Sequence, residues 1–243
     1  MKSPLKRRID QLLVDRKLAD SRQKAQALIL AGQVLVDRQK VSKPGHLVPE
    51  DCGIELLAQL PFVSRGGIKL EQALNHWRID VEAKVCLDIG ASTGGFTDCL
   101  LQRGASRVYA VDVGATQLAW KLQRDARVII VDHTNARHLQ PVDIPELCHL
   151  AVCDVSFISI TMILPELPTL LTPEGEMVIL IKPQFEVGRG EVGKGGIVRD
   201  SALHDSACRK VTEAVESLGF RARVIGVQSQ APSNREFLLH ASH

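Results

Sequence analysis

The stretch Val85-Cys-Leu-Asp-Ile-Gly-Ala-Ser-Thr-Gly-Gly-Phe96 decides the fold class of this 243-residue chain. It opens with a short apolar run, continues through three glycines and leads into an amphipathic segment at 95–102. An apolar run of this length predicts a buried strand, and glycines directly after it let the backbone turn sharply into a helix. The stretch therefore predicts a strand, a tight loop and a helix in succession.

The same alternation of apolar runs and helical segments fills residues 61–243. Strands that alternate with helices favour a largely parallel sheet covered on both faces, so we expect an α/β domain. The other predicted strands are 108–113, 128–131, 150–153, 177–181, 223–227 and 236–240, and the predicted helices are 67–77, 95–102, 115–122, 161–170 and 202–218.

Charge is distributed unevenly along the chain. The formal net charge is only +2, yet residues 1–43 contain eleven Lys and Arg against four Asp. A basic segment ahead of a mildly acidic remainder suggests contact with a polyanion, although a solvated basic face would explain it equally well. Within this segment Asp20 or Ser21 is the predicted N-cap of a helix and Gly32 is its predicted end. We expect a small α+β domain at 1–60, a linker at 60–62 and a larger domain at 61–243.

Several classes of protein are disfavoured by the sequence. No apolar run is long enough to cross a bilayer, and the basic N-terminus lacks the apolar stretch of a secretory signal. The six cysteines show no Cys-x-x-Cys spacing, so we interpret them as reduced thiols. We therefore expect a cytoplasmic protein without a membrane span, a disulfide framework or a metal site.

Polar residues follow the predicted strands, where ligands of parallel sheets bind. The glycine spacing is Gly-x-x-x-Gly-Gly, which disfavours the Gly-x-Gly-x-x-Gly site of a nicotinamide dehydrogenase. Asp112 follows the second strand, where a carboxylate can accept hydrogen bonds from ribose hydroxyls, and Asp132 follows the third. The open alternatives are a tight turn without a ligand for the glycines and helix capping for the two aspartates.

Four ionisable residues form a second pattern. Asp154 and Lys182 close predicted strands, Glu236 opens the last strand, and Lys69 lies near the start of the helix before the first strand. A charge at the end of a core strand needs a partner or a function. Two structural Lys–carboxylate ion pairs are the alternative to a catalytic group.

The basic segment resembles the small RNA-binding domain named after ribosomal protein S-four. The resemblance rests on Arg8-Ile-Asp-Gln-Leu-Leu13, on Ser21-Arg-Gln-Lys-Ala25 and on Val41-Ser-Lys-Pro-Gly45. It implies RNA as a partner, because no helix suited to a DNA major groove is evident and folded RNA is often recognised by shape and backbone. The phosphate contacts that it implies are Arg7, Arg8, Arg22, Lys24, Lys40 and Lys43, and Arg65 is a further candidate in the larger domain.

The larger domain resembles the class I, Rossmann-like methyltransferases, which implies a mostly parallel sheet with an antiparallel last strand and S-adenosylmethionine as cofactor. The four ionisable residues resemble the Lys-Asp-Lys-Glu tetrad of the FtsJ-type ribose 2′-O-methyltransferases. The positions that match the cofactor site are Asp88, Gly90, Ala91, Ser92, Gly94, Gly95, Phe96, Asp112, Asp132 and Asp154, and those that match the catalytic tetrad are Lys69, Asp154, Lys182 and Glu236.

Characteristic blocks also occur at 63–69 and 88–98, in Asp154-Val-Ser-Phe-Ile-Ser159 and in Lys182-Pro-Gln-Phe-Glu186. With these blocks the chain resembles, end to end, the TlyA-type ribosomal RNA 2′-O-methyltransferases, which are also labelled haemolysins. The resemblance implies transfer of a methyl group to a cytidine 2′-hydroxyl of large-subunit rRNA. A lysine can remove the hydroxyl proton only in its neutral form, which burial and a neighbouring cation favour. We interpret Lys182 as this base, with Lys69 as the neighbouring cation and Asp154 and Glu236 as the residues that orient the lysines.

Two alternatives in other functional classes remain. A non-catalytic ribosome-assembly factor would need the RNA-binding domain but neither a donor site nor all four ionisable residues. A haemolysin is suggested by the family label alone. We also predict a mobile loop at 188–197, and we name Phe157, Phe185 and Trp120 as the few residues able to stack on RNA bases.

Overall fold

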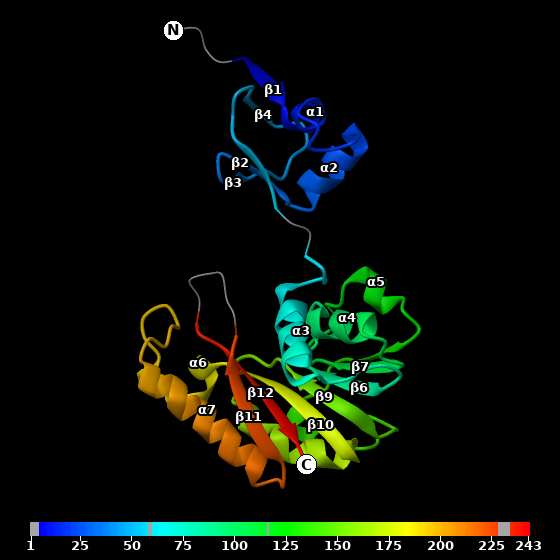
Figure 1. Ribbon diagram of the computed structural model, residues 1–243, viewed down its shortest axis with the longest axis vertical. Coiled ribbons are helices and arrows are strands. Elements are labelled where there is room, and N and C mark those ends of the chain that lie inside the picture. The colour runs from blue at the N-terminus through cyan, green and yellow to red at the C-terminus, as the bar shows by residue number, and fades with distance from the viewer. Residues whose placement is uncertain (1–4, 58–59, 116, 228–233) are drawn as a thin grey trace. The chain divides into compact units, whose positions relative to one another are not determined.

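The computed structural model describes residues 5–57, 60–115, 117–227 and 234–243. Two compact units make up the chain, Met1–Leu60 and Pro61–His243 (Figure 1). Each unit has its own hydrophobic core, which is what an independently folded domain requires.

The first unit combines two helices with short antiparallel strands. Strand β1 pairs with β4, and a three-stranded sheet has the order β3-β2-β5. The elements are β1 (Lys6–Arg8), α1 (Ile9–Asp15), α2 (Arg22–Leu30), β2 (Val34–Val36), β3 (Gln39–Lys40), β4 (Leu47–Pro49) and β5 (Ile54–Leu56).

The capping signals of the second helix are confirmed. The Ser21 side chain accepts a hydrogen bond from the backbone N–H of Lys24 at 3.2 Å, which satisfies one free donor of the first turn. Gly32 has a φ of +67°, the left-handed conformation that ends many helices. Ile9, Leu13 and Ile29 are fully buried and form the centre of this unit's core.

A seven-stranded sheet of order β11-β12-β10-β9-β6-β7-β8 forms the centre of the second unit. Strands β6 to β10 are mutually parallel, and β12 runs antiparallel to both of its neighbours. The predicted fold class is therefore confirmed. The strands are β6 (Val85–Ile89), β7 (Arg107–Val111), β8 (Val128–Val131), β9 (Cys148–Cys153), β10 (Leu171–Ile181), β11 (Arg221–Gly226) and β12 (Phe237–Ser242).

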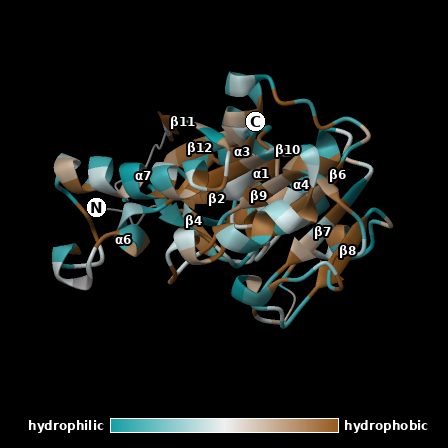
Figure 2. Cartoon of the chain, turned by 90° about the horizontal axis from the view of Figure 1, so that it is seen from below, coloured by the Kyte–Doolittle hydropathy of each residue, from teal (hydrophilic) through white to brown (hydrophobic). Residues whose placement is uncertain are grey.

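Helices cover both faces of this sheet. The α-helices are α3 (Arg65–Trp77), α4 (Gly95–Gln102), α5 (Trp120–Gln123), α6 (Pro183–Glu186) and α7 (Ser201–Glu216), and the 3₁₀ helices are η1 (Ala136–His138), η2 (Ile160–Met162), η3 (Leu164–Leu170) and η4 (Arg189–Glu191). One core cluster joins the sheet to η2, η3 and α7, and the other joins it to α3, α4 and α5. Figure 2 accordingly shows the central strands as mainly hydrophobic and the helices as mixed.

Three local predictions were wrong. The predicted linker includes Phe62, but this side chain is buried in the core of the second unit. It packs where Gly67 has no side chain, since a Cβ there would lie 2.4 Å from the Phe62 ring. The predicted helix 161–170 consists of 3₁₀ turns, because Pro168 lacks the N–H that an α-helix needs.

The predicted helix 115–122 is also too long. Helix α5 starts only at Trp120, and Thr116 lies outside the described residues. Ala119 is extended, with a ψ of 140°, and its N–H donates to the Thr93 carbonyl at 3.1 Å. This bond holds the chain against the glycine loop, so that the helix begins only after Ala119.

The glycine-rich segment 188–197 contains the short η4 helix and a single bridge between Gly193 and Ile197. Asn234 holds the end of this segment, because its amide donates to the Gly196 carbonyl at 2.7 Å and accepts from the Val198 N–H at 2.9 Å. No helix in the described part of the chain has the length and apolar character needed to span a membrane.

Candidate active site

A cavity of about 900 Å³ opens where the parallel strands of the second unit end. Its wall comes from the segments that follow β6, β7, β8, β9 and β10, which the parallel order brings to one edge of the sheet. Gly90, Ser92, Asp112 and Asp154 are the residues of the predicted cofactor set that line it. A cavity of this size suits a ligand as large as a nucleoside derivative.

Gly90 is the glycine that borders the cavity. Its φ is +81°, and a Cβ at this position would lie 2.6 Å from the backbone carbonyl oxygen of Asp154. Any side chain here would push the β6 and β9 ends apart. The close approach of these two strand ends therefore requires glycine.

The other two glycines of the loop serve the packing of helices. A Cβ on Gly94 would lie 2.2 Å from the Leu122 side chain of α5, and one on Gly95 would lie 2.1 Å from the Ser64 hydroxyl beside α3. Ala91 and Phe96 are buried as well. These four predicted cofactor positions shape the loop without lining the cavity.

Asp112 is held in a defined orientation at the end of β7. Its carboxylate accepts hydrogen bonds from the Ser92 N–H at 2.9 Å and from the Gly114 N–H at 3.1 Å. The remaining lone pairs of the two oxygens can accept further hydrogen bonds from a ligand in the cavity. Asp132, at the end of β8, is not among the residues that line the cavity.

Asp88 lies beneath the glycine loop with its side chain fully buried. The Thr97 hydroxyl of α4 donates to one carboxyl oxygen at 2.6 Å, while the other oxygen has no hydrogen-bond partner among the described residues. Burial raises the pKa of Asp88 to about 7. This carboxyl joins β6 to α4 and does not reach the cavity wall.

The four ionisable residues form two close ion pairs. Lys182 Nζ lies 2.5 Å from Asp154 Oδ1, and Lys69 Nζ lies 2.5 Å from Glu236 Oε2. All four side chains are mostly buried, with 12–24% of their surface exposed. A charge in such a position needs the partner that each has here.

Strand register brings the two pairs to the same edge of the sheet. Ile181 of β10 pairs with Phe237 of β12. Lys182 comes directly after Ile181 and Glu236 directly before Phe237, so these two residues lie next to each other at the end of the paired strands. Asp154 is fixed beside β6 by a hydrogen bond from its N–H to the Ile89 carbonyl at 2.9 Å. Lys69 and Glu236, which are separated by 167 positions in the sequence, are thus in direct contact at this edge of the sheet.

Sequence reasoning missed two groups next to these pairs. Lys182 also donates to the Ser156 hydroxyl at 2.9 Å, so this serine helps to orient the ammonium group. The buried Glu186 carboxylate accepts from Ser159 Oγ at 2.5 Å and from the Ile160 N–H at 2.8 Å. Ser156 follows β9 and Glu186 ends the short helix after β10, but nothing in their spacing distinguished them.

Phe157 is the most unusual residue of the cavity wall. Its side chain is 92% exposed, and its φ of +66° is unfavourable for a bulky residue. The ring lies 5.4 Å from that of Phe185, which also lines the cavity. Such backbone strain clusters at functional sites.

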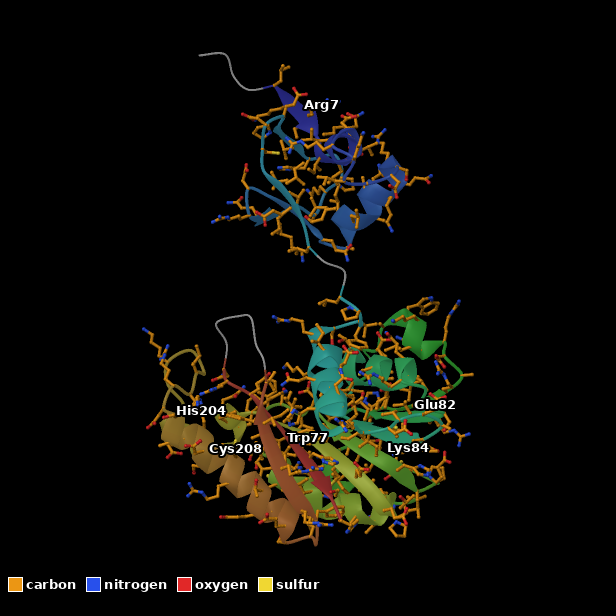
Figure 3. The ribbon with its side chains drawn as sticks, in the orientation of Figure 1. Arg7, Trp77, Glu82, Lys84, His204 and Cys208 are labelled. Atoms are coloured by element: carbon orange, nitrogen blue, oxygen red, sulfur yellow. The ribbon has the colours of Figure 1, made fainter. Side chains whose placement is uncertain are left out.

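The basic residues of the first unit differ in how freely they face solvent. Arg8 and Arg22 both pair with the buried Asp10, whose pKa their hydrogen bonds hold well below its usual range. Arg7 pairs with Asp15 at 2.6 Å and with Glu50 at 3.2 Å (Figure 3). The predicted RNA contacts that are exposed are Arg22, Lys24, Lys40 and Lys43 in this unit and Arg65 on α3, whereas Arg7 and Arg8 are half-buried.

Comparison with known proteins identifies the class. Residues 62–243 match the family model of FtsJ-like methyltransferases, and residues 7–51 match the S4 domain. The chain therefore belongs to the FtsJ-like methyltransferase family. This membership confirms the predicted resemblance to the FtsJ-type methyltransferases and the prediction that the protein is an enzyme of the methyltransferase class.

Particular relatives extend this assignment over the whole chain. Hemolysin A of Brachyspira hyodysenteriae is 44% identical over 96% of this chain and 98% of its own length. The 16S/23S rRNA (cytidine-2′-O)-methyltransferase TlyA of Mycobacterium tuberculosis is 44% identical over 91% of this chain and 83% of its own length. A solved structure from Streptococcus thermophilus, described as a hemolysin, is 42% identical with a TM-score of 0.74 and covers 99% of this chain and 89% of that one.

Proposed function

We propose that this protein transfers a methyl group from S-adenosylmethionine to a ribose 2′-hydroxyl of ribosomal RNA. The observation that carries the proposal is the Lys182–Asp154 ion pair, whose carboxylate lines a nucleoside-sized cavity at the strand ends, together with the Lys69–Glu236 pair at the same edge of the sheet. The relatives named as rRNA (cytidine-2′-O)-methyltransferases support a cytidine as the acceptor. An rRNA substrate also implies a cytoplasmic protein.

The residues around the cavity fit S-adenosylmethionine. Gly90 leaves the backbone bare at the cavity edge, and Asp112 is oriented with lone pairs available for the two ribose hydroxyls of a nucleoside. Asp154 lies on the cavity wall next to Lys182 and would face the reacting end of the donor. When bound, this cofactor supplies a methyl group on a sulfonium, activated for transfer to oxygen.

The chain's own residues handle the acceptor proton. In the proposed mechanism Lys182 Nζ accepts the proton of the 2′-hydroxyl as the oxygen attacks. Asp154 and Ser156 hold this lysine in place, and the Lys69 ammonium, itself held by Glu236, stabilises the developing negative charge on the oxygen. Two purely structural ion pairs are the competing interpretation.

RNA recognition is assigned to both units. We propose that residues 1–60 form the RNA-binding domain and residues 61–243 the methyltransferase domain. The exposed Phe157 ring, supported by Phe185, is suited to stack on the target base after it leaves its helix. The proposed phosphate contacts are Arg7, Arg8, Arg22, Lys24, Lys40, Lys43 and Arg65.

The test compares Lys182→Ala with Lys84→Ala, a control lysine that precedes β6 at the opposite edge of the sheet (Figure 3). Methyl transfer to unmodified rRNA is followed with labelled donor, and the modified nucleotide is mapped by primer extension. We expect Lys182→Ala to lose at least about a hundredfold in rate, within the range of a general base, and Lys84→Ala to keep the wild-type rate. Near-wild-type turnover by Lys182→Ala would refute the mechanism.

Calorimetry separates this function from a non-catalytic assembly factor. Wild-type protein and Lys182→Ala should both bind S-adenosylmethionine, because this lysine does not line the cavity. Absence of binding by the wild-type protein would favour the assembly factor instead.

A further inference from the structure

Trp120 exposes an unusually large part of an indole ring outside the cavity. It begins helix α5, and 65% of its surface is accessible. Aromatic residues make up only 4% of this chain, which contains two tryptophans. Burial of an indole ordinarily stabilises a folded protein, so this exposed ring forgoes much of that gain.

A guanidinium group covers part of the same ring. Arg124 lies one helical turn after Trp120, and its Cζ is 4.0 Å from the ring centroid. Neighbouring cations are held by carboxylates, Lys121 by Asp98 and Arg127 by Asp125. Within the described residues no carboxylate pairs with Arg124, so its N–H donors remain available.

Short contacts fix this pair beside the donor loop. The Ala119 N–H donates to the Thr93 carbonyl at 3.1 Å, and the Leu122 side chain occupies the space that Gly94 leaves. Leu118 and Leu122, two residues before and two residues after Trp120 in the sequence, are both buried. Trp120 is thereby attached rigidly to the loop whose Gly90 and Ser92 line the cavity.

We propose that Trp120 and Arg124 form an RNA-contact site on the methyltransferase unit. An unpaired base near the target nucleotide would stack on the indole, and Arg124 would donate to its phosphate. RNA is the occupant that the chemistry favours, because an apolar protein groove would leave the Arg124 charge buried and unpaired. The proposal rests on the proposed action on RNA but concerns a surface separate from the cavity.

The two tryptophans permit a direct optical test. Trp77 is half-buried and stacks on His240 with ring centroids 5.2 Å apart, so its environment is set by the protein core (Figure 3). A Trp77→Phe variant leaves Trp120 as the one indole. Titration with an unmodified rRNA transcript that contains the target region should quench its emission, and the midpoint should match the Kd from filter binding.

Affinity measurements complete the test. Trp120→Ala in the otherwise wild-type chain should raise the Kd for the transcript about tenfold, within the range of one lost base stack. Trp120→Phe should restore much of the affinity. Arg124→Ala should raise the Kd and should make the Kd depend less steeply on salt concentration than in the wild-type protein. Val142→Ala is the matched control, since Val142 is 80% exposed in the same unit, and it should leave the Kd unchanged.

Any of three different outcomes would overturn the proposal. Unchanged emission and Kd would exclude contact with RNA. Quenching by ribosomal subunits but not by the transcript would indicate a protein partner, and a change with protein concentration alone would indicate self-association. Failure of the proposed function is distinguishable, because wild-type protein would then bind RNA without methylating it while Trp120 still reported binding.

Discussion

Replacement of Glu186 should uncouple the positioning of the active site from the rest of the fold. The buried carboxylate accepts from Ser159 Oγ, from the Ile160 N–H and from Lys210 Nζ at 3.2 Å. Ser159 belongs to the segment that carries Asp154, and Glu186 belongs to the segment that carries Lys182. Glu186 therefore holds the two segments together, and α7 adds a third contact through Lys210.

The magnitude follows from what each variant leaves unpaired. Glu186→Ala leaves the buried Ile160 N–H without a partner, at about 1–3 kcal/mol, and removes a charge-assisted bond worth about 1.5–3 kcal/mol. The Lys210 side chain is 44% exposed, so its share is discounted for solvent screening. A total loss of about 3 kcal/mol lowers the Tm by about 10 °C for a unit of this size. Glu186→Gln keeps one acceptor oxygen and should lose about half as much.

Thermal unfolding and steady-state kinetics together test this reasoning. We expect Glu186→Ala to reduce kcat by about 10- to 100-fold, the cost of a misplacement near 1 Å, while the Kd for S-adenosylmethionine changes little. Glu186→Gln should recover part of kcat, and Lys210→Met should lower the Tm only slightly. A wild-type kcat in Glu186→Ala despite a lower Tm would show that Glu186 is structural alone, and an unchanged Tm would refute the clamp itself.

Three further predictions concern single side chains. Burial raises the pKa of Asp88 to about 7, so the native state binds the Asp88 proton more tightly than the unfolded chain does. The free energy of unfolding should therefore fall as pH rises from about 4 to 7, and Asp88→Asn should remove this part of the pH dependence in denaturant titrations. The lowered pKa of Asp10 has the opposite sign, so the first unit should lose stability as pH falls below about 4, and Asp10→Asn should lack this loss when unfolding is followed by circular dichroism. Gly90→Ala should weaken cofactor binding in calorimetry, since its Cβ would meet a backbone oxygen and its φ is positive; binding at wild-type strength would contradict the tight approach of β6 and β9.

The sequence predicted best what local pattern determines. Strands at 85–89 and 128–131 and the helix at 95–102 were located to the residue, because apolar runs and glycine boundaries mark them. Strands β1 and β4 were missed, since three-residue strands carry no alternation and pair only across 40 intervening positions. Phe62 was misassigned for a related reason, as its burial depends on the missing side chain of Gly67.

The candidate site was likewise predicted where a local pattern marks a residue, and missed where only the fold brings residues together. Asp154, Lys182 and Glu236 were identified by their place at strand ends and Lys69 by the resemblance to the FtsJ-type tetrad, and the structure brings the four into two ion pairs. Gly94 and Gly95 were assigned to the cofactor because a sequence does not distinguish a backbone that approaches a ligand from one that approaches a helix. Ser156 and Glu186 escaped notice because their partners come from segments whose proximity only the folded sheet creates.

The pairing of charges explains how one site can accept both substrates. While both lysines are protonated, the two ion pairs sum to zero and repel neither the phosphates of RNA nor the positive sulfonium of the donor. Once Lys182 has lost its proton and can act as the base, the Asp154 carboxylate remains to attract the sulfonium. Each partly buried lysine would be costly without its carboxylate, which is why the charges occur as pairs instead of a single base. The pairs also differ in their surroundings: Lys182 has the additional Ser156 contact and follows the strand next to the one that carries Asp154, while Lys69 comes from a helix. That asymmetry supports the proposal that Lys182 accepts the proton and Lys69 stabilises the developing charge.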